Sequence, residues 1–83
     1  MFSASLHIKI QSPEGPVWEG RADSISSENV HGPFDVLPQH ARFITVIQKK
    51  DIFVREGKEL KTFNFPRALM FVRDDQVSIY TGL

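Results

Sequence analysis

Hydrophobic and polar positions alternate with a period of two along several short stretches of this 83-residue chain. The clearest stretch is Leu6-His7-Ile8-Lys9-Ile10, where the alternation predicts a strand with one buried face. Extended character returns from Val17 to Ile25. The run from Phe43 to Ile47 is rich in β-branched and aromatic residues, and this composition predicts a central strand.

Turn-forming residues separate these stretches roughly every 8 to 12 residues. Ser12 to Pro16 combines prolines with a glycine, and Asn29 to Pro33 is a second turn cluster. Lys49 to Asp51 marks a surface turn. Two hairpins are predicted beyond it, namely Ile52–Arg55 with Lys58–Phe65 through Glu56-Gly57, and Ala68–Arg73 with Gln76–Tyr80 through Asp74-Asp75.

These patterns predict roughly seven to nine short strands in one domain that spans residues 1–83. Arg67 to Phe71 is the best helical segment, but isolated helices below about 12 residues are marginal in water. An all-β fold is therefore expected, either an antiparallel sandwich or a small barrel. The predicted core contains Leu6, Ile8, Ile10, Trp18, Ile25, Val36, Phe43, Val46, Ile52, Val54, Phe63, Leu69, Phe71, Val77 and Ile79.

The charge of the chain limits the class of partner that it could bind. Ten basic and ten acidic side chains cancel, which argues against the basic surface that nucleic-acid binding needs. Residues 1–40 nevertheless carry a net charge of −3, and residues 41–83 a net charge of +3. This asymmetry fits either ordinary solvated faces or a protein with one acidic and one basic side that docks within an assembly.

Three features predict a soluble protein of a reducing compartment. The chain has no cysteine, which excludes disulfides and thiolate metal sites. Its apolar runs are far shorter than the roughly 20 residues of a membrane span. Residues 1–4 lack the basic flank and the apolar segment of a signal peptide. We therefore expect a cytoplasmic domain.

No motif in the chain predicts catalysis or a cofactor. His7, His31 and His40 could each act as a base, but no Gly-x-Ser-x-Gly motif frames a serine nucleophile. His31, Asp35 and His40 have metal-ligand chemistry, yet they lack a cysteine or a His-x-His pair beside them. The glycine-rich phosphate-binding motifs are absent. We therefore expect no catalytic, metal-binding or cofactor-binding residue.

Aromatic residues bear on partner binding instead. His40 could hold its turn through a hydrogen bond to a neighbouring carbonyl, take part in chemistry, or contact a partner. Trp18 could belong to the core or anchor a partner. The seven phenylalanines are too many for so small a core, and alternation places Phe53 on the face opposite Ile52 and Val54. Exposed apolar surface, which usually marks an interaction site, is therefore expected.

Three segments of the chain carry a resemblance to a known family. They are Leu-x-Ile-x-Ile-x-Ser-Pro-Glu at residues 6–14, Val17-Trp18-Glu19-Gly20, and Gly32-x-Phe34-x-Val36-Leu37-Pro38-x-His40-Ala41-x-Phe43-Ile44-Thr45. From Leu6 to Tyr80 the chain resembles the N-terminal β-sandwich domain of the epsilon subunit of F-type ATP synthases, whose mitochondrial equivalent is called delta. The family's typical form of the third segment is close to Gly-x-Leu-Gly-Ile-Tyr-Pro-Gly-His-Ala-Pro-Leu-Leu-Thr. The resemblance implies an antiparallel sandwich of two packed sheets with about 8–10 short strands.

Several positions depart from the family pattern. Asp35 and Gln39 stand where the family usually has glycine, and Arg42 where it often has proline. Pro66-Arg67-Ala68 replaces a Ser-Gly-Gly-like step. Glycine is favoured where φ is positive, and aspartate tolerates that conformation better than most residues, so Gln39 is the least expected replacement. These departures indicate a divergent branch, matched to its own complex.

The resemblance implies a non-catalytic subunit of the rotor, at the foot of the central stalk, that couples the gamma subunit to the ring of c subunits. The implied location is the cytoplasmic side of the cell membrane, peripheral and only through the complex. Residues that match the region facing the c ring are Asn29, Val30, His31 and Gly32, and those that match the region facing gamma are Pro38, His40, Arg42, Phe43 and Thr45.

Some alternatives stay open at this point. Family members usually continue into a two-helix C-terminal domain that inhibits ATP hydrolysis and in some bacteria binds ATP, and no residue up to Leu83 can carry that regulation. Whether the gene is short or this sequence is part of a longer protein is undecided. Other hypotheses are a stand-alone sandwich module that binds another soluble protein, and a small hydrolase that uses His40 with Ser or Asp partners.

Overall fold

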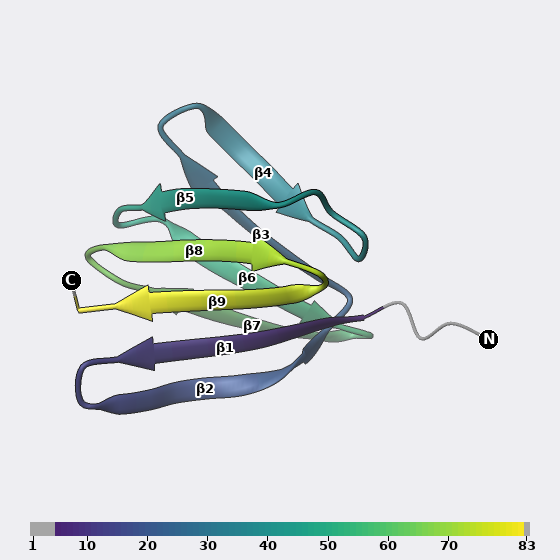
Figure 1. Ribbon diagram of the computed structural model, residues 1–83, viewed down its shortest axis with the longest axis horizontal. Helices are drawn as coiled ribbons and strands as arrows, with labels where there is room; N and C mark the ends of the chain where they lie inside the picture. Colours follow the sequence, from purple (N-terminus) through teal and green to yellow (C-terminus); the bar gives the residue numbers. More distant parts are fainter. Residues whose placement is uncertain (1–4, 83) are drawn as a thin grey trace.

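The computed structural model describes residues 5–82, which form nine β-strands in two packed sheets (Figure 1). The strands are β1 (Leu6–Ser12), β2 (Gly15–Ala22), β3 (Ser24–Asn29), β4 (Gly32–Val36), β5 (Phe43–Ile47), β6 (Asp51–Glu56), β7 (Glu59–Asn64), β8 (Ala68–Arg73) and β9 (Gln76–Thr81). One sheet has the order β2-β1-β9-β8-β5 and the other the order β4-β3-β6-β7. The expected all-β sandwich is confirmed, and the small barrel is wrong because the two sheets stay separate.

Two expectations concern residues outside the described range. Residues 1–4, where no signal peptide was expected, lie outside it. They include Phe2, one of the seven phenylalanines considered for exposed apolar surface. No helix in residues 5–82 is long and apolar enough to cross a bilayer.

Turn chemistry explains where the strands reverse. Gly57, with φ of 60°, begins the two-residue turn between β6 and β7. Asp74 and Asp75, with φ of 51° and 62°, form the two-residue turn between β8 and β9. Tight hairpins need positive φ at these positions, and aspartate is one of the few residues besides glycine that tolerates it. Both predicted hairpins are therefore confirmed, although the first turns at Gly57 and Lys58, one residue later than the predicted Glu56-Gly57.

Strand pairing differs from the expectation in two respects. β1 pairs with β9 in parallel, whereas the other pairs are antiparallel, so the sandwich is not wholly antiparallel. The strand predicted to be central, Phe43–Ile47, is β5 at the edge of the five-stranded sheet. The β-branched and aromatic composition of this strand indicates that one of its faces is buried. The position of a strand within a sheet depends instead on distant pairing partners.

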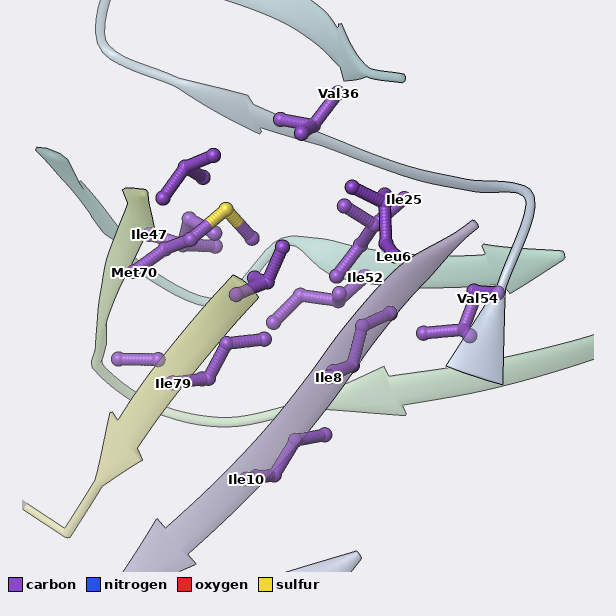
Figure 2. Packing of buried hydrophobic residues seen from close by; sticks show 14 residues of the cluster. Leu6, Ile8, Ile10, Ile25, Val36, Ile47, Ile52, Val54, Met70 and Ile79 are labelled. Carbon is purple, nitrogen blue, oxygen red and sulfur yellow. The ribbon is translucent and has the colours of Figure 1, made fainter. Parts of the chain in front are cut away.

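The core lies between the sheets and consists of aliphatic side chains from both of them (Figure 2). Its buried members are Leu6, Ile8, Ile10, Ala22, Ile25, Val36, Ile47, Ile52, Val54, Ala68, Met70, Val72, Val77 and Ile79. The predicted core residues Trp18, Phe43 and Phe63 are only partly buried, and they pack against this cluster. Phe53 is 38% exposed, as alternation predicted.

The prediction for the face of β8 is wrong. Phe71 is 41% exposed and Leu69 is only half-buried, while Ala68, Met70 and Val72 face the core. Five consecutive apolar residues contain no alternation, so composition cannot select a face. The hairpin does select it, because Val72 pairs with Val77 and Met70 with Ile79. Paired residues share a face, and both partners in β9 are buried.

The same error affects β5. Val46 was predicted to lie in the core but is 39% exposed. It pairs with Leu69, and both side chains lie on the outer face of the five-stranded sheet. Since register sets the face of every residue in a strand, one wrong choice for β8 carries over to its neighbour.

Aromatic side chains close one edge of the sandwich, where Trp18 of β2 meets Phe63 of β7. Trp18 packs on Phe63 with ring centroids 5.7 Å apart, and Phe63 stacks on Phe65 at 6.3 Å. The Trp18 ring covers Gly20 so closely that a Cβ there would lie 2.6 Å from it. This explains the Trp-x-Gly spacing in the chain, and it places Trp18 at the border of the core.

The acidic and basic halves of the chain do not form separate layers. Each sheet contains two strands from residues 1–40 and two or three from residues 41–83. The two halves are therefore not divided by layer, and a surface with one acidic and one basic side stays a prediction.

Candidate functional site

The segment that joins β4 to β5 contains a tight turn built on Pro38 and Gln39. The amide of His40 donates a hydrogen bond to the carbonyl of Leu37, with 3.1 Å between nitrogen and oxygen. Gln39 has φ of 68°. Proline in the second position and a residue with positive φ in the third are typical of a type II turn. A type II turn favours glycine at its third position, and Gln39 adopts the positive φ that this position requires.

His40 is held by two contacts. Its Nδ1 donates a hydrogen bond to the carbonyl oxygen of Ala41 at 2.8 Å. Its ring meets Phe43 edge-on, with 5.6 Å between centroids, and the side chain is half-buried. The hypothesis of a turn histidine bonded to a neighbouring carbonyl is confirmed. The ring is thus fixed in direction, as a docking residue would be.

An aromatic contact joins β4 and β5, the two strands that flank this turn. Phe43, on β5, packs against Phe34 of β4 with centroids 5.3 Å apart. β4 and β5 belong to different sheets, so the contact closes the edge of the sandwich opposite Trp18. The β4–β5 connection therefore rests on packed side chains at a sheet edge.

The predicted gamma-facing residues differ in accessibility. Arg42 is exposed, and Pro38 and His40 are half-buried. Phe43 and Thr45 share the inner face of β5 with buried Ile47. Their contact with a partner stays a prediction, although both side chains are turned toward the sandwich.

Sequence reasoning missed the residues that β5 presents outward. Ile44 is 59% exposed and Val46 39% exposed. Ile44 pairs with Phe71, which is also exposed, so apolar side chains line the outer face beside the β4–β5 connection. The signal that could have found them is the alternation forced by a buried Ile47.

The predicted c-ring-facing residues form the turn of the β3–β4 hairpin. Asn29 Oδ1 accepts a hydrogen bond from the amide of His31 at 2.8 Å, which fixes the turn. Val30 is 89% exposed and His31 is exposed as well. Gly32 has φ of 115°, a value that favours glycine. The hairpin therefore presents a short, exposed, well-defined tip.

The alternative chemical roles receive no support from the geometry. In residues 5–82, no group of three or more His, Asp or Glu side chains gathers to hold a metal. Asp35 is instead engaged by the hydroxyl of Ser26, which donates a hydrogen bond to its carboxylate. A hollow of about 430 Å³ on the outer face of the four-stranded sheet is lined by polar residues such as Ser26 and Asn64, and His40 is not part of its wall.

Residues 5–82 match the family model described as ATP synthase, delta/epsilon chain, beta-sandwich domain. Curated relatives carry the name ATP synthase epsilon chain. The one from Leptospira borgpetersenii serovar Hardjo-bovis (strain JB197) is 31% identical over 81 residues, which cover 98% of this chain and 64% of the relative. The one from Maricaulis maris (strain MCS10) is 41% identical over 59 residues, which cover 70% of this chain and 44% of the relative.

The chain thus spans less than two thirds of the length of these relatives. Its fold is similar to that of a chain in the cryo-EM structure of the Euglena gracilis mitochondrial ATP synthase, OSCP/F1/c-ring. The TM-score is 0.86 at 15% identity, over 98% of this chain and 52% of that chain. At this identity, the likeness supports the fold alone.

Proposed function

The chain belongs to the ATP synthase delta/epsilon-chain β-sandwich family, and from this premise we propose that it is an epsilon-type subunit of the central stalk of an F-type, ion-translocating ATP synthase. The observation that carries the proposal is the family match over residues 5–82. The proposed role is non-catalytic and mechanical. The proposed complex lies at the membrane, on its cytoplasmic side. The chain is held at the membrane only through its partners in that complex.

The proposed gamma-binding surface is the Pro38–His40 turn together with the outer face of β5. His40 and Arg42 supply polar contacts, and Ile44 and Val46 supply exposed apolar area beside them. Apolar side chains surrounded by polar groups are typical of protein interfaces. Arg42 adds a charge at the rim, which contributes to specificity more than to affinity.

The proposed c-ring-binding surface is the tip of the β3–β4 hairpin, from Asn29 to Gly32. A narrow and exposed tip suits contact with the polar loops of a membrane-embedded ring. It lies at the opposite end of β4 from the Pro38–His40 turn, but Asn29 bonds to Thr45 of β5, so the two proposed surfaces adjoin at that strand. A sandwich held by a continuous aliphatic core is stiff enough to keep two such surfaces in register under torque.

Co-purification with the gamma subunit from the same source tests the proposal. The chain is co-expressed with tagged gamma, with and without any further C-terminal residues that the gene encodes. A stoichiometric complex that survives gel filtration is the expected result. Elution of the chain apart from gamma, in both forms, contradicts the proposal and favours a stand-alone module that binds another protein.

A further inference from the structure

A hydrogen bond joins two loops that are 36 residues apart in the chain. The backbone amide of Gln39 donates it to Asp75 Oδ1, with 2.6 Å between the two atoms. Asp75 belongs to the turn between β8 and β9. Figure 1 shows this turn and the β4–β5 connection at the same end of the molecule, close to the start of β1. Hydrogen bonds to a carboxylate are stronger than those between neutral groups.

Asp75 reaches the loop from a fixed base. The register of the hairpin around it pairs Arg73 with Gln76, which leaves a turn of two residues. The carbonyl oxygen of Asp75 accepts a hydrogen bond from the amide of His7 at the start of β1, with 2.9 Å between the two atoms. The residue is half-buried. Its backbone is thus tied to two strands, while its side chain points to a third segment.

Gln39 lies in the turn from Leu37 to His40, which we call the docking turn, and it is the residue of that turn that most needs such a tie. It has φ of 68°, and this backbone conformation raises the free energy of a residue that carries a side chain. An amide held by a carboxylate offsets part of that cost. The next residue is His40, whose own amide completes the turn with Leu37. A change in the conformation of Gln39 therefore redirects His40.

We propose that Asp75 is a positioning residue for the docking turn, which it holds in the conformation that presents His40 and Arg42 to the gamma subunit. The proposal rests on the proposed function for its partner. It assigns the hydrogen bond from Gln39 to Asp75 a role in recognition, through the shape of the turn and without direct contact between Asp75 and gamma.

The neighbouring Asp74 supplies a matched control. It lies in the same turn and has nearly the same backbone conformation, with φ of 51°. Its carboxylate, however, faces Arg73 at 3.5 Å, and its side chain is 79% exposed. A change at Asp74 alters the charge and the turn as a change at Asp75 does, but leaves the bond to Gln39 intact.

Amide hydrogen exchange at Gln39 measures the tie directly, without any partner. Asp75→Gly removes the carboxylate but keeps the turn, because glycine adopts positive φ at no steric cost. Exchange of the Gln39 amide is expected to become about tenfold faster in Asp75→Gly, while Asp74→Gly leaves it unchanged. Asp75→Asn is expected to restore protection, since its carbonyl oxygen still accepts and asparagine tolerates the turn.

Titration with gamma measures the consequence. Affinity is expected to fall about tenfold in Asp75→Gly, to recover in Asp75→Asn and to match the wild type in Asp74→Gly. Unchanged exchange in Asp75→Gly overturns the proposal, because the turn is then held by other contacts. Unchanged affinity with faster exchange overturns it too. A wild-type chain that does not bind gamma refutes the proposed function, and the exchange comparison then decides separately whether Asp75 holds the turn.

Discussion

The side-chain amide of Asn29 donates a hydrogen bond to the hydroxyl of Thr45, 3.0 Å away, and so bridges the two sheets. Asn29 ends β3 in the four-stranded sheet, and Thr45 lies in the middle of β5 in the five-stranded sheet. The Oδ1 of the same Asn29 side chain accepts the amide of His31. One side chain therefore links the hairpin tip proposed to face the c ring with the strand proposed to face gamma.

Thr45→Val is expected to lower the free energy of unfolding by about 1 kcal/mol, because the half-buried Asn29 amide loses its acceptor while the volume at position 45 hardly changes. Urea unfolding followed by the fluorescence of Trp18, the single tryptophan of the chain, measures the change. Thr45→Ser keeps the hydroxyl and serves as the control. Unchanged stability in Thr45→Val together with a loss in Thr45→Ser would show that packing at Thr45 matters and the hydrogen bond does not.

Gly20→Ala is expected to destabilise the fold by about 1 to 3 kcal/mol. A Cβ at position 20 would lie 2.6 Å from the Trp18 ring, and that ring is held in place by Phe63. Thermal unfolding monitored by circular dichroism measures the loss.

A double-mutant cycle with Trp18→Leu separates this clash from the general effect of alanine on the strand. In the Trp18→Leu background the ring is gone, so Gly20→Ala is expected to cost much less. The same cost in both backgrounds would contradict the packing explanation.

Gln39→Gly is expected to raise stability by about 0.5 to 1 kcal/mol. Glycine removes the free-energy cost of the left-handed conformation. This gain exceeds the loss of stability from the conformational entropy that glycine adds to the unfolded chain. For a domain of this size the expected rise in Tm is about 2 to 8 °C, measured by calorimetry. Gln48→Gly is the control, since Gln48 is exposed and does not have positive φ. It is expected to lower Tm, and a fall in Tm for both variants would contradict the explanation.

Local chemistry was sufficient to predict most of the turns and the period of the strands. Gly57 and the Asp74-Asp75 pair mark hairpins because few other residues adopt positive φ. The alternation of β1 likewise identifies its buried face correctly. In each case the determining residues are neighbours in the chain, so their pattern is visible in one sequence.

Distant contacts could not be predicted in this way. The parallel pairing of β1 with β9 joins the first and last strands, and the bond between Gln39 and Asp75 joins the β4–β5 connection to the β8–β9 turn. Neither leaves a periodic signal. The outward direction of Ile44 is an intermediate case, because it follows from the β8–β9 register once that register is applied strand by strand.

His40→Ala is expected to weaken gamma binding about tenfold while the isolated chain keeps most of its stability. The ring lies at the surface end of an aromatic stack that ends in Phe34, so its loss removes a fixed contact from the turn and leaves the core intact. Isothermal titration with purified gamma measures the affinity, and thermal unfolding of the same samples verifies the fold.

His31→Ala is the matched control, because His31 is exposed on the hairpin tip at the far end of β4. It is expected to leave gamma affinity unchanged and to weaken binding of the chain–gamma complex to detergent-solubilised c ring. Since the two histidines differ in place and not in chemistry, opposite effects on the two partners assign each surface to one of them. Equal effects of both substitutions on both partners would mean that the hairpin tip and the Pro38–His40 turn do not form separate surfaces.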